Sequence, residues 1–233
     1  MILKHMIIII HIYNFVKKNI LIYYYINILM YDNGRKIPSN IENPFDTILI
    51  SYCDKLIDYC YTLKITPNFV TIFRIFLALF IYYDIFNTSN ILFPVLGTLI
   101  FYFLDCLDGH LARSTNQVTV LGDYLDHIAD VSFIIILMIF LLIKNYPGKK
   151  YIIITLLILL YLMSVHMGLQ QKNYKKNKKE ELGSFEQFET LDYLNYIHNL
   201  SPKHICWTRF FGCGTLILFA CFTIFWVQYN TKK

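Results

Sequence analysis

The sequence predicts an all-α integral membrane protein with five or six transmembrane helices and an N-terminal interfacial amphipathic helix. Of its 233 residues, 56% are hydrophobic and 17% are aromatic, which is more apolar than the surface of a water-soluble domain tolerates. The apolar residues form long runs of about 20 residues, the length that an α-helix needs to cross a bilayer. Strands of an outer-membrane barrel would instead alternate apolar and polar residues.

Five segments are long and apolar enough to span a membrane. They are expected at residues 66–85, 91–113, 118–143, 151–170 and 205–227. Two shorter apolar pieces within residues 1–31 flank Lys17 and Lys18. One continuous span there would bury both lysines, at about 2.5–3.5 kcal/mol each, so an interfacial segment or a signal anchor is an equal alternative to a sixth span. The absence of a small-residue cleavage site argues against a cleaved signal peptide.

These patterns divide the chain into four regions. They are an N-terminal hydrophobic segment with a polar linker (1–42), an interfacial amphipathic helix (43–65), a membrane domain (66–227) and a short tail (228–233). In the second region apolar residues recur at helical period on one stripe, and Asn43 and Pro44 suit a helix start. Off the stripe lie Asp46, Asp54, Lys55 and Asp58. We interpret this region as a helix on the membrane surface, with a short helix packed on the bundle as the alternative.

The charged residues outside the apolar runs predict the topology. Residues 171–203 are expected to form a solvated cytosolic loop, because a lysine run is followed there by acids. The basic residues before the first span and in this loop place the N-terminal side, the aspartate-rich stretch and the active site in the cytosol. Lys144, Lys149 and Lys150 fall in the opposite loop and count against this topology.

The overall charge and the cysteines limit the class further. The net charge of +5 suits contact with anionic lipid headgroups and is too small and scattered to indicate nucleic acid. The six cysteines form no CxxC pair, and most lie in apolar runs. They are expected to be buried free thiols rather than a disulfide framework.

The stretch LDCLDGHLARSTNQVTVLGDYLDHIADV, residues 104–131, carries five aspartates inside this apolar chain. Asp105 and Asp108 are three residues apart, and Asp126 and Asp130 are four apart, so each pair shares one face of a helix. Two helices joined by a short turn run antiparallel and bring the four carboxylates into one pocket. These anions would repel one another unless hard divalent cations such as Mg²⁺ or Mn²⁺ neutralised them. Two such ions can clamp a diphosphate.

Small residues lie beside these acids. Gly109 and Ala112 leave one face of the first helix bare, and Gly122 does the same on the facing helix, so a bulky ligand can approach the backbone. The guanidinium of Arg113 can donate two parallel hydrogen bonds to a phosphate. A cation transporter would also use intramembrane aspartates, but it would not need these small residues and Arg113 at these offsets.

The spacing Asp105-x2-Asp108-Gly109-x2-Ala112-Arg113-x8-Gly122-x3-Asp126-x3-Asp130 matches every fixed position of the CDP-alcohol phosphotransferase signature. The chain resembles this family over residues 66–227. The resemblance implies two metal ions held by Asp105, Asp108, Asp126 and Asp130, with Asp130 also acting as the catalytic base. It implies that CDP is bound by Gly109, Ala112, Arg113, Thr119 and Gly122. Asp123 lies outside the signature and is expected to be a structural or solvated carboxylate.

Further stretches bear on which member of the family the chain resembles. TPNFVTIFRIF, with Pro67, Asn68 and Thr71, resembles the first helix of the family in general, and an arginine at position 74 is similar to members that take CDP-diacylglycerol. Asn68 and Arg74 are candidate donor or acceptor contacts. DGHLAR, with His110, and SVHMGLQ resemble phosphatidylinositol synthase. The Asn-Gln-x-Thr run is shared with phosphatidylglycerophosphate synthases. DHIAD, with His127, is instead similar to the aminoalcohol phosphotransferases. Arg209 is a further candidate acceptor contact.

The expected function is transfer of a phosphatidyl group from CDP-diacylglycerol to an alcohol, with release of CMP. Myo-inositol is favoured as the acceptor, because a phosphorylated acceptor needs cations, and few basic residues (Lys172, Lys203 and Arg209) are expected near the pocket. The alternatives are a phosphatidylglycerophosphate synthase, a choline or ethanolamine phosphotransferase, and an inactive membrane homologue. The expected partners are a CDP-linked lipid donor, a small alcohol acceptor and membrane lipids, with a second copy of the chain as a candidate; nucleic acid is not expected.

Overall fold

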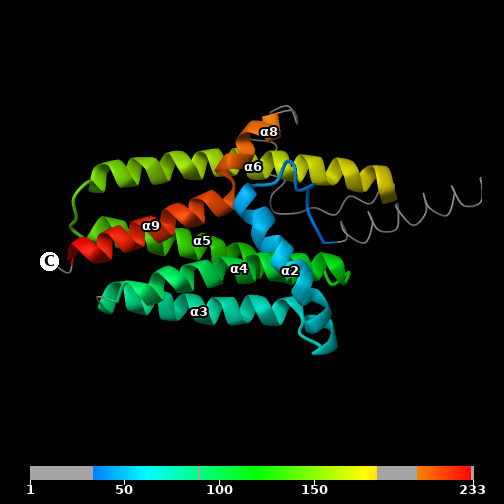
Figure 1. Ribbon diagram of the computed structural model, residues 1–233, viewed down its shortest axis with the longest axis horizontal. Coiled ribbons are helices and arrows are strands. Elements are labelled where there is room, and N and C mark those ends of the chain that lie inside the picture. Colours follow the sequence, from blue (N-terminus) through cyan, green and yellow to red (C-terminus); the bar gives the residue numbers. More distant parts are fainter. Residues whose placement is uncertain (1–33, 89, 183–203, 232–233) are drawn as a thin grey trace, which may run out of the picture. The chain divides into compact units, whose positions relative to one another are not determined.

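The computed structural model describes residues 34–88, 90–182 and 204–231, which fold mainly as helices (Figure 1). They are α2 (Pro44–Thr62), α3 (Pro67–Asn87), α4 (Leu92–Ser114), α5 (Val120–Ile143), α6 (Lys149–Leu182), the short α8 (Ile205–Thr208), the 3₁₀ turn η2 (Arg209–Phe211) and α9 (Cys213–Thr231). In this part of the chain, five helical segments are long and apolar enough to cross a membrane. The prediction of an all-helical, multi-pass membrane protein is confirmed. The apolar pieces at 1–31, and with them the sixth span, lie outside the described residues.

Helix α6 is longer than the sequence predicted. The span expected at 151–170 begins at Lys149, and the helix continues to Leu182. The prediction of a loop is therefore wrong for residues 171–182. These residues contain neither glycine nor proline, and among them are five lysines and two glutamates, which are good helix formers. Gly183 follows them in the sequence.

The last predicted span, 205–227, is not one continuous helix. The chain makes the turns α8 and η2 and then passes through Gly212, whose ψ of −178° is extended, before α9 begins. The amide of Asn43 donates to the carbonyl of Arg209 at 2.7 Å and to Thr215 Oγ1 at 3.0 Å. These two bonds tie the start of α2 to the chain on both sides of the break.

The main apolar core lies among α3, α4, α5 and α9. Gly97 of α4 faces Ile81 of α3, and a Cβ at Gly97 would lie 2.9 Å from the isoleucine side chain, so the glycine allows these helices to approach. Phe140 is fully buried and meets Phe86 edge-on, with ring centroids 5.9 Å apart. The outer faces of the helices expose large apolar side chains such as Phe80, and lipid tails would cover such a surface.

Helix α2 lies across the bundle and packs mainly against α4 and α9 (Figure 1). Cys53 and Cys60 are buried in an apolar cluster with residues of α3 and α4, whereas Tyr52 and Tyr59 are exposed. The helix therefore packs on the bundle and still offers an exposed apolar strip; its position at a membrane surface stays a prediction. All six cysteines are free, as predicted, but Cys206 is exposed rather than buried.

The packing assigns opposite roles to two phenylalanines. Phe140→Ala should destabilise the bundle by roughly 3–5 kcal/mol, because it removes a fully buried ring and leaves a cavity. Phe80→Ala removes a ring that is 64% exposed on the outer face and should change stability far less. The apparent melting temperatures of both variants in the same detergent are the measurement. Equal losses for the two variants would contradict this core.

Candidate active site

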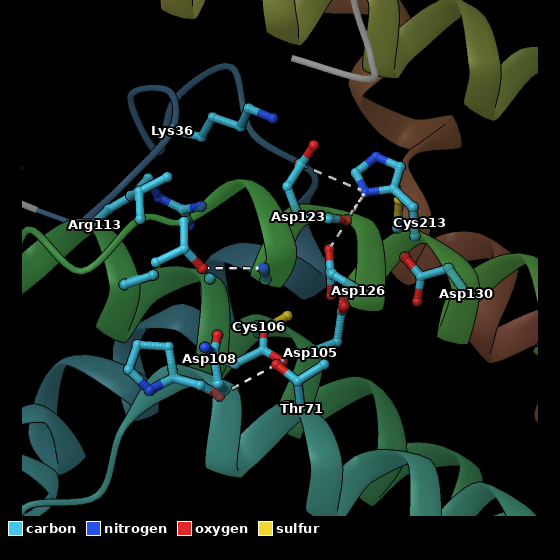
Figure 2. Close-up of a pocket in the computed structure, with 18 of the residues that line it drawn as sticks. Lys36, Thr71, Asp105, Cys106, Asp108, Arg113, Asp123, Asp126, Asp130 and Cys213 are labelled. Carbon is cyan, nitrogen blue, oxygen red and sulfur yellow. Dashed lines mark hydrogen bonds and ion pairs between the residues drawn. The ribbon is translucent and has the colours of Figure 1, made fainter. Parts of the chain in front are cut away.

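Two helices carry the four aspartates of the predicted metal site. Asp105 and Asp108 lie on α4, and Asp126 and Asp130 lie on α5. Both helices pack against α3. Figure 2 shows the carboxylates of Asp105, Asp108 and Asp126 close together at one pocket, and each offers an oxygen within 4.8 Å of the others. Asp130 lines the same pocket one turn further along α5.

Arg74 of α3 lies fully buried among these carboxylates. Its guanidinium forms ion pairs with Asp105, with Asp126 at 2.9 Å and with Asp130 at 3.3 Å. It also lies over the ring of Phe101, 4.9 Å from the centroid. The sequence suggested a donor or acceptor contact for Arg74, and in the structure its partners are aspartates. Because a buried charge is tolerated only when it is paired, Arg74 ties α3 to both acidic helices.

The remaining aspartate has a different partner. Thr71, almost one helical turn before Arg74, donates its hydroxyl proton to Asp108 Oδ2 at 2.7 Å, and Asp108 is 4% exposed. Helix α3 therefore supplies a partner to all four acids, through one hydroxyl group and one guanidinium. Four carboxyl groups thus share one arginine, and a divalent cation would offset the remaining negative charge.

The chemistry of the donor set fits a hard divalent cation. Asp105, Asp108 and Asp126 form a group of three with neither histidine nor cysteine in it. Oxygen ligands alone are what Mg²⁺ and Mn²⁺ prefer. Asp130 is not in this group of three and lies beside the guanidinium of Arg74. It is therefore the aspartate best separated from the other three for a second role.

The predicted CDP contacts line the same pocket; they are Gly109, Ala112, Arg113, Thr119 and Gly122. Asn68, a predicted donor or acceptor contact, lines it too. Thr119 caps α5 by accepting from the backbone N–H of Gly122 at 3.0 Å, and a Cβ on Gly122 would lie 2.9 Å from both Asn68 Oδ1 and Thr119 Oγ1. A Cβ on Gly109 would lie 3.1 Å from Arg113 Nη1. The two glycines therefore leave room for polar side chains at the pocket wall.

Three other residues singled out in the sequence have partners within the protein. Arg209 donates to a backbone carbonyl in the segment before α2 and is not among the residues that line the pocket. His110 Nε2 lies 2.6 Å from Asp54 Oδ1 on α2. His127 lines the pocket, and its Nδ1 lies 2.7 Å from the carbonyl of Asp123 and 3.6 Å from the carboxylate of that residue.

Part of the pocket wall comes from residues that the sequence analysis did not assign to the site. They are Lys36, Glu42, Asp46, Ile50, Thr71, Tyr102, Met167, Gln170 and Cys213, among others. Thr71 could have been found, because it lies three residues before Arg74 on the same helical face. The residues from α2, α6 and α9 meet the aspartates only through tertiary packing, so their spacing along the chain gives no signal.

The fold and the site define a multi-pass membrane protein with an acidic pocket suited to divalent cations. A model of the CDP-alcohol phosphatidyltransferase family matches residues 64–227, and the chain belongs to this family. Its members are phosphotransferases that pass a phosphatidyl group from a CDP-alcohol to an acceptor and depend on divalent metal ions. The match leaves α2 outside. A search of curated proteins and a search of solved structures found no match.

The aspartate group makes a direct prediction for activity. Asp126→Asn should lower CMP release about a hundredfold or more, because it removes a charged oxygen ligand while keeping the size of the side chain. Asp84→Asn is the matched control: Asp84 lies on α3 outside the pocket lining and accepts from Thr88 Oγ1 at 2.8 Å, a bond that asparagine can also accept. Full activity of Asp126→Asn, with both variants inserted equally, would contradict the site.

Arg74 makes a second prediction, which concerns stability. Arg74→Gln should lower the apparent melting temperature in EDTA, because the carboxylates lose their buried countercharge. Added Mg²⁺ or Mn²⁺ should then raise the melting temperature of the variant more than that of the wild type, since the ion and the guanidinium share ligands. Arg74→Lys, which keeps the charge, should fall between the two. Equal metal-dependent shifts in all three proteins would contradict a shared set of ligands.

Proposed function

We propose that the protein transfers the phosphatidyl group of CDP-diacylglycerol to a small neutral alcohol, myo-inositol being the favoured acceptor, and releases CMP. The observation that carries the proposal is one pocket whose lining offers three kinds of group. It combines small residues with Arg113, the four aspartates, and Lys36, Glu42 and Asp46. A donor, the metal ions and an acceptor need such groups in one place.

The small residues and Arg113 support a nucleotide diphosphate as the donor. Gly109 and Gly122 place no side chain in the pocket wall, and the guanidinium of Arg113 lies close to Gly109, where it can pair with a phosphate. Thr119 is fixed at the start of α5 by its capping bond. The resemblance of the Arg74 stretch to members that take CDP-diacylglycerol favours the lipid nucleotide over CDP-choline.

The residues that precede the family domain support a neutral alcohol as the acceptor. Asp46 lines the pocket with Lys36 and Glu42, and Glu42 is paired with Arg35 at 2.8 Å. A phosphorylated acceptor would bring a dianion against Asp46, and like charges in a partly buried site repel strongly. Arg209, a candidate cation from the sequence, donates to a backbone carbonyl instead. Hydroxyl groups of a polyol can bond to carboxylates without this repulsion.

In the proposed mechanism Asp130 accepts the proton of the acceptor hydroxyl. Its side chain is 40% exposed, so the hydroxyl can reach it. The acceptor oxygen then attacks the β-phosphorus, the bond from that phosphorus to the bridging oxygen breaks, and CMP leaves. Arg113 holds the phosphate groups during this step. Two divalent ions, Mg²⁺ or Mn²⁺, held by the aspartates would neutralise the diphosphate and the departing charge.

The proposal includes a cytosolic active site. Basic residues favour the cytosolic side of a membrane. Before the first span lie Arg35, Lys36 and Lys64, and at the pocket end of the second span lies Arg113.

The intact set of aspartates supports an active enzyme over an inactive homologue.

A choline or ethanolamine phosphotransferase is the second candidate. It is favoured by His127, which lies in the pocket next to Asp123 and belongs to the stretch that resembles the aminoalcohol enzymes. Such an enzyme would take CDP-choline and diacylglycerol as substrates, so the donor distinguishes it from the first proposal.

The test is CMP release by the purified protein with defined donors and acceptors. With CDP-diacylglycerol, myo-inositol should give phosphatidylinositol and glycerol 3-phosphate should give no product. Product from glycerol 3-phosphate alone would replace the proposal with a phosphatidylglycerophosphate synthase. Release from CDP-choline with diacylglycerol would move the protein to the aminoalcohol branch. For each pair of donor and acceptor, the Asp126→Asn variant gives the background level of CMP release.

A further inference from the structure

One wall of the pocket lies outside the domain that defines the family. The family match begins at residue 64, whereas Glu42, Asp46 and Ile50 of the pocket lining precede it. Asp46 lies in the first turn of α2, a region whose acids the sequence assigned to the polar side of a surface helix. In the structure, this carboxyl group shares a pocket with the aspartates of α4 and α5.

The position of Asp46 is fixed by bonds from two neighbouring helices. Tyr102 donates its hydroxyl proton to Asp46 Oδ1 at 2.7 Å, and the backbone N–H of Gly214 on α9 also donates to this carboxyl group. A Cβ at Gly214 would collide with Asp46 Oδ1 and lie 2.9 Å from Asn43 Oδ1, so only glycine allows this approach. Tyr102 lies three residues before Asp105 on α4, which ties Asp46 to the helix that carries two of the four aspartates.

The start of α2 is itself anchored. Asn43 Oδ1 accepts from the backbone N–H of Phe45 at 3.0 Å and caps the helix. The amide nitrogen of Asn43 donates to the carbonyl of Arg209 and to Thr215. These bonds hold the first turn of α2 against the start of α9, so the carboxyl group of Asp46 has little freedom to move.

An acid at this position is electrostatically unfavourable. Burial raises the pKa of Asp46 to about 7, and the negative charges of Glu42 and Asp105 raise it as well, while the Tyr102 hydrogen bond lowers it. Asparagine could accept the same two hydrogen bonds without charge repulsion. Packing of α2 alone therefore does not explain the aspartate, and contact with a ligand in the pocket does.

We propose that Asp46 hydrogen-bonds a hydroxyl group of the acceptor and makes the enzyme select neutral polyols over phosphorylated alcohols. This inference rests on the proposed function and adds a specificity residue to it. A hydroxyl donates to the carboxylate, which strengthens polyol binding. A phosphate at the same position would face the carboxyl group of Asp46, which disfavours phosphorylated acceptors.

The test compares Asp46→Asn with the matched control Asp58→Asn, an exposed aspartate on the same helix. In the full-length protein, Asp46→Asn should raise the KM for myo-inositol roughly ten- to a hundredfold. This is the loss of affinity expected when one hydrogen bond to a charged group is lost. The KM for CDP-diacylglycerol and the melting temperature should stay near the wild-type values. The ratio of glycerol 3-phosphate to myo-inositol turnover should rise, because a negative charge has been removed. Asp58→Asn should match the wild type in all four measurements.

A second variant keeps the test decisive if Asp46→Asn does not fold. Tyr102→Phe leaves the carboxyl group in place and removes the bond that orients it, so the KM for myo-inositol should rise by a smaller factor with kcat little changed. Equal rises in the KM values of donor and acceptor, or an unchanged acceptor KM in both variants, would overturn the role of Asp46. Wild-type protein that uses glycerol 3-phosphate and not myo-inositol would instead overturn the proposed function.

Discussion

Three of the four site aspartates, from two helices, pair with one buried arginine, and this charge balance constrains the surrounding helices. Arg74 of α3 is fully buried and pairs with Asp105 of α4 and with Asp126 and Asp130 of α5. An unpaired buried guanidinium would be costly, so α3 must stay in contact with both acidic helices. The aspartates of α4 and α5 thus line one pocket, and the excess of acid in it favours divalent cations.

The helix before the family domain completes this pocket. Asn43 anchors α2 to the start of α9, and Gly212 and Gly214 provide the space for that contact. The last membrane segment breaks at Gly212, beside this contact, and Asp46 of the anchored first turn lines the pocket. The hydrogen bonds of Asn43 therefore link the start of α9 to the part of the site that carries Asp46.

Periodic features were predictable from the sequence, and long-range contacts were not. The spacings of three and four residues predicted cofacial aspartates on each helix, and Asn43 before Pro44 predicted the start of α2. The hydrogen bond from Tyr102 to Asp46 joins residues 56 positions apart, and no periodicity encodes such a pair. A lysine run followed by acids favours a solvated loop, so this pattern does not predict the helix at 171–182, although lysine and glutamate are good helix formers.

Binding of Mn²⁺ to the purified protein, followed by electron paramagnetic resonance, tests the central claim most directly. The carboxylate cluster should bind two Mn²⁺ ions close enough for spin coupling in the presence of a CDP-alcohol. Asp105→Asn should abolish this signal, while Asp58→Asn on the exposed face of α2 should retain it. Mn²⁺ binding that is absent in the wild type, or unchanged by Asp105→Asn, would contradict a metal site built on these aspartates.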